Sequence, residues 1–305
     1  MRKGINYEVG PFTRGKDLPV RELFDASVVR REMDIIKNDL HCDSIRISGQ
    51  ELSRLYSASE FALQQGLEVW FSPELTDASE KETLEYIKEC AITAQKLQSF
   101  SSNVIFVLGS ELTVFMSGFI EGRTPFDRIK TLMKPARLIK NTLLRGPYQK
   151  RFEIFLAKAV SVVRDYFYGR ITYAAGSWEN ADWSLFDFIG INYYRDILNK
   201  YTFREDIKKY FIYRKPVVIL KFGCGTYKGA EDRGSYSWAM IDRKKKPSQL
   251  KKGFVRDEDN QAECLTDLLT IFKNENVNGA FVYTFESPYY LHSENPAFDL
   301  DTCKL

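Results

Sequence analysis

The sequence has few histidines and few cysteines. Its 305 residues include two histidines, His41 and His292, and five cysteines, none of them spaced as Cys-x-x-Cys. Two histidines are little material for a histidine metal site or a Ser-His triad, and an odd number of cysteines does not suit a disulfide framework. We therefore expect no metal site, and reduced thiols as in a cytoplasm.

Nucleotide-binding motifs and a strong net charge are also missing. No Gly-x-Gly-x-x-Gly follows the first predicted strand and no phosphate-binding loop occurs anywhere, so we expect no cofactor. Forty-four basic and 41 acidic residues leave a formal charge of +3, which provides no global field for nucleic acid. The most basic run, residues 243–246, lies beside Pro247 and is interpreted as a solvated hairpin.

Long apolar runs are absent too. The N-terminus lacks the apolar stretch of a signal peptide. Residues 98–120 carry a single charge, Glu111, but Ser, Asn, Gly and Thr interrupt them too often for a membrane helix. We expect a soluble, cytoplasmic protein that binds neither membranes nor nucleic acid.

The sequence does contain a regular alternation of short apolar strands and helices. The expected strands are at residues 4–9, 44–49, 67–73, 103–111, 170–175, 187–194, 217–221 and 279–286. Helical spacing of apolar residues predicts helices near 27–40, 51–65, 79–98, 148–167, 204–213 and 258–274. This pattern predicts an α/β fold, a single-domain (β/α)8 TIM barrel over residues 1–305, with a long irregular insertion at about 112–146. A doubly wound sheet is the alternative, and the missing dinucleotide motif argues against it.

Polar residues stand at the predicted C-terminal ends of the strands, which converge on one cleft in such a barrel. The candidates for catalysis are Glu111, Lys221 and Glu286. The candidates for substrate binding are Arg46, Glu74, Trp178, Glu179, Asn192 and Tyr193. Carboxylates, cations and aromatic rings together predict a site for a polar, hydroxyl-rich small molecule or carbohydrate.

Three short motifs carry a resemblance: DFIGINYY at 187–194, PVVILKFG at 216–223 and GSEL at 109–112. Together they resemble family-one β-glucosidases and related retaining glycoside hydrolases. Residues 187–194, DFIGINYY, are similar to the sixth-strand signature of that family. Its seventh strand usually reads PIYITENG, with the Glu as nucleophile, and residues 216–223, PVVILKFG, overlay it without a gap and place Lys221 at the nucleophile. Its fourth strand ends in Asn-Glu-Pro, and GSEL at 109–112 matches only in the acid/base Glu111.

The same resemblance assigns supporting roles to two further residues. Arg46 is similar to the second-strand arginine, and Tyr193 to the sixth-strand tyrosine, that support the nucleophile in this family. The resemblance thus implies the glycoside hydrolase superfamily. The sequence also resembles bacterial proteins labelled abortive phage infection proteins, a label that implies no chemistry.

Lys221 is the departure that matters. Retaining hydrolysis needs two carboxyl groups about 5–5.5 Å apart, and a lysine cannot form the glycosyl ester. Three functions stay open. In the first, Glu111 is the acid and Glu286, Glu179 or Glu74 activates water. In the second, Lys221 forms a Schiff base with a carbonyl substrate while Glu111 shuttles protons. In the third, the cleft only binds a ligand, and Lys221 pairs with Glu111.

Overall fold

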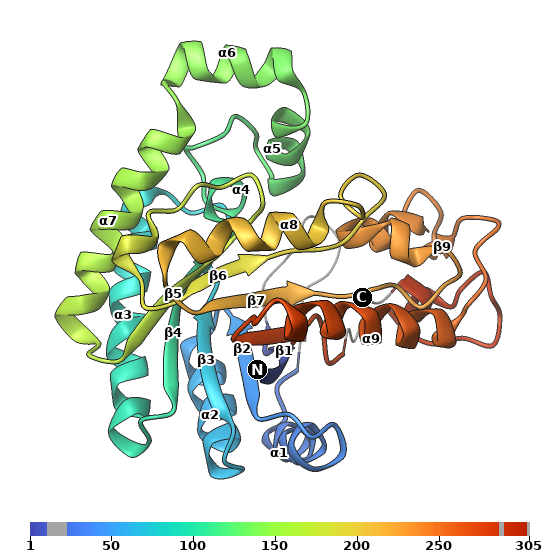
Figure 1. Cartoon of the computed structure of the whole chain (residues 1–305), viewed down its shortest axis with the longest axis horizontal. Helices are drawn as coiled ribbons and strands as arrows, with labels where there is room; N and C mark the ends of the chain where they lie inside the picture. The colour runs from blue at the N-terminus through green and yellow to red at the C-terminus, as the bar shows by residue number, and fades with distance from the viewer. Residues whose placement is uncertain (11–22, 287–289, 304–305) are drawn as a thin grey trace.

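Eight parallel strands close into a barrel in the computed structural model, which describes residues 1–10, 23–286 and 290–303 (Figure 1). Their order around the barrel is β1-β10-β7-β6-β5-β4-β3-β2. The strands are β1 (Arg2–Glu8), β2 (Ser44–Gly49), β3 (Glu68–Pro73), β4 (Val104–Ser110), β5 (Arg170–Ala175), β6 (Ile189–Asn192), β7 (Val217–Phe222) and β10 (Gly279–Val282). The predicted TIM barrel is confirmed, and each expected strand is present.

Helices alternate with these strands and cover the outside of the barrel (Figure 1). The main ones are α1 (Ala26–Asp34), α2 (Leu52–Gln64), α3 (Glu80–Phe100), α7 (Tyr148–Tyr166), α8 (Phe203–Lys208) and α9 (Glu258–Asn274). Side chains fix where they begin. Ser79 and Glu82 form the predicted capping box of α3, and Asp257 accepts a hydrogen bond from the Asn260 amide at the start of α9.

The interior of the barrel is a packed core rather than a pore. Alternate residues of the strands point inward, and the Trp70 ring lies 5.1 Å from the rings of both Phe188 and Phe281. Val218 and Leu220 of β7 belong to the same buried cluster. This apolar layer leaves only the C-terminal ends of the strands for polar chemistry.

The segment between β4 and α7 is largely helical, which corrects the expectation of an irregular insertion. It contains α4 (Leu112–Phe115), α5 (Pro125–Leu132) and α6 (Pro135–Arg145). Its prolines stand at the first position of α5 and α6, where the missing N–H costs nothing, and Gly146 ends α6 with φ +78°. Pro125, Pro135 and Gly146 mark helix boundaries here.

The basic run 243–246 forms the expected hairpin. It is exposed between β8 (Ile241–Asp242) and β9 (Gln249–Leu250), which pair antiparallel. No helix within the described residues is both long and apolar enough to cross a membrane.

Candidate functional site

Irregular register at the C-terminal ends of β4, β6 and β7 decides which side chains face the barrel mouth. The pairing of β7 with β6 shifts between Ile191 and Asn192, and the latter pairs with Lys221. The pairing of β4 with β5 shifts before Ser110. Strict alternation would turn Lys221 outward, because Leu220 already points inward. The shift leaves Leu220 of β7 without a partner residue on β6, and this extra residue turns Lys221 toward the mouth.

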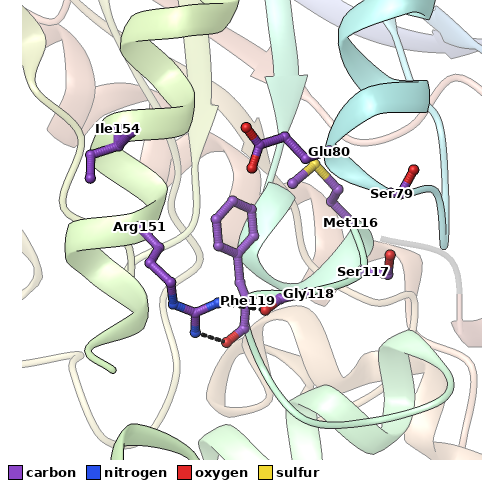
Figure 2. A pocket seen from close by; sticks show the side chains of 8 residues that line it. All are labelled: Ser79, Glu80, Met116, Ser117, Gly118, Phe119, Arg151 and Ile154. Carbon is purple, nitrogen blue, oxygen red and sulfur yellow. Dashed lines mark hydrogen bonds between the residues drawn. The ribbon is translucent and has the colours of Figure 1, made fainter. Parts of the chain in front are cut away.

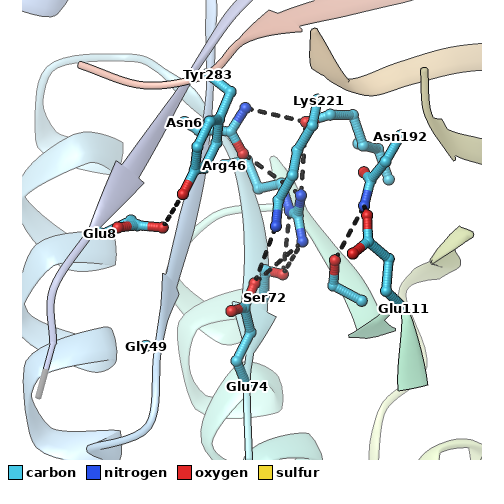
Figure 3. Close-up of polar contacts among 12 residues, drawn as sticks. Asn6, Glu8, Arg46, Gly49, Ser72, Glu74, Glu111, Asn192, Lys221 and Tyr283 are labelled. Atoms are coloured by element: carbon cyan, nitrogen blue, oxygen red, sulfur yellow. Dashed lines mark hydrogen bonds and ion pairs between the residues drawn. The ribbon is translucent and has the colours of Figure 1, made fainter. Parts of the chain in front are cut away.

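A charged cluster occupies one half of the mouth (Figure 3). The guanidinium of Arg46 is fully buried, and its Nη2 lies 3.4 Å from Glu74 Oε1. Lys221 Nζ lies 3.8 Å from the same oxygen and 5.2 Å from the centroid of the Tyr283 ring. Ser72 Oγ accepts hydrogen bonds from Arg46 Nε and Nη2 at 3.1 and 3.0 Å. Lys221 therefore pairs with Glu74, and not with Glu111 as the ligand-binding alternative supposed.

Glu111 occupies the other half of the mouth, directly after β4 and at the N-cap of α4. It is half-buried, and its backbone is left-handed, with φ 50° and ψ 43°. Asn192 Nδ2 donates to Glu111 Oε1 at 2.8 Å and to Ser110 Oγ at 3.1 Å (Figure 3). Asn192 Oδ1 is buried and has no hydrogen-bond partner within the described part of the chain. The Asn192 side chain thus holds the Glu111 carboxylate in place, while its Oδ1 is left as a hydrogen-bond acceptor for a ligand.

Glu179 is buried beneath this half of the mouth and is fully engaged. Its Oε1 accepts from the Thr113 amide and hydroxyl at 2.9 and 2.7 Å, and its Oε2 accepts from Tyr173 Oη and the Gly176 amide at 2.9 Å each. Burial raises the pKa of Glu179 to about 7, although these hydrogen bonds oppose the shift. The Trp178 indole donates to the same Thr113 hydroxyl at 3.0 Å. Glu179 and Trp178 tie the loop after β5 to α4.

The side chain of Tyr193 does not point into the charged cluster. Tyr193 turns toward α8, where its ring stacks on Phe203 at 4.8 Å and its hydroxyl donates to Asp206 at 3.1 Å. The Tyr193 side chain therefore points away from Glu111 and Lys221, although its backbone amide donates to the Lys221 carbonyl at 2.9 Å. Glu286 is half-buried after β10 and borders residues 287–289, which lie outside the described chain.

Sequence reasoning missed Asn6 and Ser72, which lie beneath the charged cluster. Asn6 Nδ2 donates to the carbonyl of Leu220 at 2.9 Å, and Asn6 Oδ1 lies 3.4 Å from Arg46 Nη1. Each lies among buried residues of its strand, Asn6 in β1 and Ser72 in β3. A polar residue within a strand that is buried on both faces was the available signal.

Two cavities lie on this side of the barrel strands β3 and β4 and at the neighbouring helices. A cavity of only about 10 Å³ lies between the ends of β3 and β4; its lining includes Glu74 and Ser110. A larger pocket, of about 270 Å³, lies at the start of α3 and α7 (Figure 2). Its lining is Ser79, Glu80, Met116, Ser117, Gly118, Phe119, Arg151 and Ile154, with no predicted site residue. Arg151 donates there to the carbonyls of Gly118 and Phe119 at 2.6 Å each.

Comparison with known proteins identifies similar folds but no family. No family model and no curated protein matches the sequence. A GH113 β-1,4-mannanase superimposes with a TM-score of 0.66 at 14% identity, covering 100% of this chain and 94% of its own. The fold is that of glycoside hydrolase barrels.

Two further solved structures agree. The GH113 β-mannanase AaManA from Alicyclobacillus acidocaldarius, in complex with ManMIm, has a TM-score of 0.57 at 12% identity and covers 92% of this chain and 90% of its own. Thermotoga maritima Cel5A, a mutant form in complex with cellobiose, has a TM-score of 0.53 at 13% identity and covers 100% and 96%. At such identities the likeness is one of architecture.

Proposed function

We propose that this protein binds a carbohydrate or glycoside-like small molecule at the barrel mouth and hydrolyses it with Glu111 as the proton donor. The observation that carries the proposal is the geometry of Glu111. Its half-buried carboxyl group stands at the end of β4 and takes one side-chain hydrogen bond within the described residues, from Asn192. The rest of the carboxyl group can donate its proton to a substrate oxygen or accept from a substrate hydroxyl.

Glu74 is the second carboxylate of the proposed reaction. Two cations, Arg46 and Lys221, lie within 3.4 and 3.8 Å of its Oε1 and favour its ionised form. Water attacks the anomeric carbon while Glu74 takes a proton from it, and Glu111 protonates the leaving oxygen as the glycosidic bond breaks. This direct displacement inverts the anomeric configuration and needs no ester at position 221.

The surroundings of Glu111 suit a hydroxyl-rich ligand. Asn192 Oδ1 is a buried acceptor without a partner in the described residues, and a sugar hydroxyl is a fitting donor.

Schiff-base chemistry finds less support. A lysine that attacks a carbonyl must lose its proton, and the Glu74 carboxylate 3.8 Å away favours the charged ammonium instead. A second candidate function is ligand binding without catalysis. It is favoured by the ion pair that Lys221 makes where the resembling family has its nucleophile, and by the small volume between β3 and β4.

The change Glu111→Gln tests the proposal, because it keeps the shape of the side chain and removes the proton. We expect hydrolysis of a panel of aryl glycosides to fall by about 10²–10⁴-fold. The matched control is Glu85→Gln on the exposed side of α3, whose rate should equal that of the wild type. A wild type that binds oligosaccharides but hydrolyses none, with unchanged affinity in Glu111→Gln, would favour the second candidate function.

A further inference from the structure

Positive charge is concentrated in one part of this protein. Residues 122–150 contain eight lysines or arginines and a single acidic residue, Asp127, so this segment carries +7. The other 276 residues together carry −4. The small charge of the whole chain therefore conceals a strongly basic segment, which contains α5 and α6 and which we call the α5–α6 arm.

The arm also exposes apolar side chains. Met133, Ile139, Leu143 and Leu144 have between 61% and 81% of their surface exposed. A helix on the surface of a globular protein ordinarily turns its apolar side toward the core. The inward residue of α6 is instead Asn141, which is fully buried. Its Oδ1 accepts from the Glu121 amide at 3.0 Å and its Nδ2 donates to the Phe119 carbonyl at 3.3 Å.

The helix α6 is thus inverted, with polar anchors inside and apolar residues outside. Ile139 and Leu143 are four residues apart and share the face turned away from Asn141. Arg137 and Lys140 are exposed beside them. Figure 1 shows α6 at the edge of the molecule, standing clear of the barrel. Its whole outer side is therefore available to a flat surface.

Polar contacts also fix the neighbouring α5. Arg128 is buried, donates to the Val114 carbonyl and forms an ion pair with Asp77 in the loop after β3. These contacts hold the arm in one orientation without using its exposed aliphatic residues. A partner would meet a preformed surface, so binding would cost little conformational entropy.

We propose that the α5–α6 arm docks this protein onto an anionic lipid bilayer, with α6 lying in the plane of the interface. Ile139, Leu143 and Leu144 enter the boundary between headgroups and acyl chains, while Arg137 and Lys140 contact lipid phosphates. With 11 residues, α6 is too short to span a bilayer and suits only this surface position. This inference departs from the sequence-based expectation of no membrane partner and does not depend on the proposed reaction.

The combination of side chains favours lipid over nucleic acid. A nucleic acid would use the basic residues but would stack its bases on aromatic rings. The large apolar residues exposed along α6 are aliphatic rather than aromatic. An anionic bilayer binds both aliphatic and basic side chains.

The test is sedimentation of the full chain with two kinds of vesicle, one of phosphatidylcholine alone and one of phosphatidylcholine mixed equally with phosphatidylglycerol. We expect the wild type to partition onto the mixed vesicles, and less so as salt increases. The double change Leu143→Ser with Leu144→Ser should weaken partitioning by at least about tenfold. The double change Arg137→Glu with Lys140→Glu should weaken it by a similar factor or more.

Matched controls remove the same side chains elsewhere. Leu198→Ser, at a leucine 89% exposed after β6, and Lys81→Glu, at an exposed lysine of α3, should partition as the wild type does. Wild type that stays in solution with both vesicles would overturn the proposal. So would partitioning that the charge variant loses and the leucine variant keeps, because that result means electrostatic binding of any polyanion. Dimerisation that the leucine variant abolishes, without vesicle binding, would assign the surface to a second copy of the chain.

Discussion

Two glutamates lie at the beginning of the four-residue helix α4, and their environments differ sharply. Glu111 precedes α4, is half-buried, and is oriented by the Asn192 amide at 2.8 Å. Glu179 binds the Thr113 amide within α4, is buried, and accepts four hydrogen bonds across its two oxygens. Both follow strands of the barrel, so both were candidates from their positions alone.

This difference distinguishes a carboxylate that stabilises the fold from one that can act on a substrate. Every donor around Glu179 belongs to the protein itself, so a substrate would have to displace one of them. Glu111 offers its remaining lone pairs to the mouth of the barrel. The number of internal donors, rather than the place at a strand end, separates the two roles.

The largest expected effect on stability comes from removing the Glu179 carboxylate. Glu179→Ala leaves two buried amides, of Thr113 and Gly176, without their acceptor. We expect the free energy of unfolding, measured by urea denaturation, to fall by about 4 kcal/mol. Glu111→Ala should cost less than about 1 kcal/mol in the same experiment. Equal losses for the two variants would abolish the distinction.

A somewhat smaller effect is expected for the charged half of the mouth. Lys221→Glu removes the cation 3.8 Å from Glu74 and places a carboxylate there instead. Breaking a buried ion pair in this way should lower the free energy of unfolding by about 3 kcal/mol. The same variant regains the carboxylate of the resembling family, so it should form a covalent adduct at position 221 with a fluorosugar. A variant as stable as the wild type would show that Lys221 and Glu74 are not in contact.

The raised pKa of Glu179 gives a third prediction, with a smaller expected effect on the free energy of unfolding. Burial raises it from the ordinary glutamate pKa of 4.5 to about 7, so the folded protein holds a proton that the unfolded chain releases. The contribution to stability is complete below about pH 4.5 and is lost as the pH rises through 7. Between pH 5 and pH 7 this loss is about 2 kcal/mol.

Urea denaturation at several pH values measures this loss. Glu179→Gln cannot ionise, so its free energy of unfolding should change less over that interval than that of the wild type. Parallel curves for the two proteins would show that Glu179 is ionised in the fold at pH 5.

The sequence predicted the strands well because each is an apolar run bounded by turns, but it could not predict which way their last residues point. Lys221 faces the mouth only because β7 shifts register there, and Tyr193 faces α8 because Asn192 before it faces inward. These irregularities depend on pairing between strands that are distant in the chain. Alternation along one strand cannot reveal them.

The arm illustrates a second limit. Helical spacing identifies an apolar side of α6 but does not say whether that side is buried. Here Asn141 takes the inward position through hydrogen bonds to Phe119 and Glu121, about 20 residues away in the chain. Only the three-dimensional contacts show that the polar side is the anchored one.

The smallest expected effect tests how firmly Glu111 is positioned. Asn192→Ala removes the amide donor of Glu111 and Ser110 and also the partnerless Oδ1, so the folded state loses two hydrogen bonds and is relieved of one unpaired acceptor. We therefore expect a change in the free energy of unfolding of no more than about 1 kcal/mol. The rate of hydrolysis should nevertheless fall about tenfold, with kcat affected more than KM, because the proton donor loses its orientation. Ser110→Ala, which removes the other acceptor of the same amide, is the control and should change kcat much less. If the two variants lower kcat equally, Asn192 acts through the packing of β6 against β4 and not through Glu111.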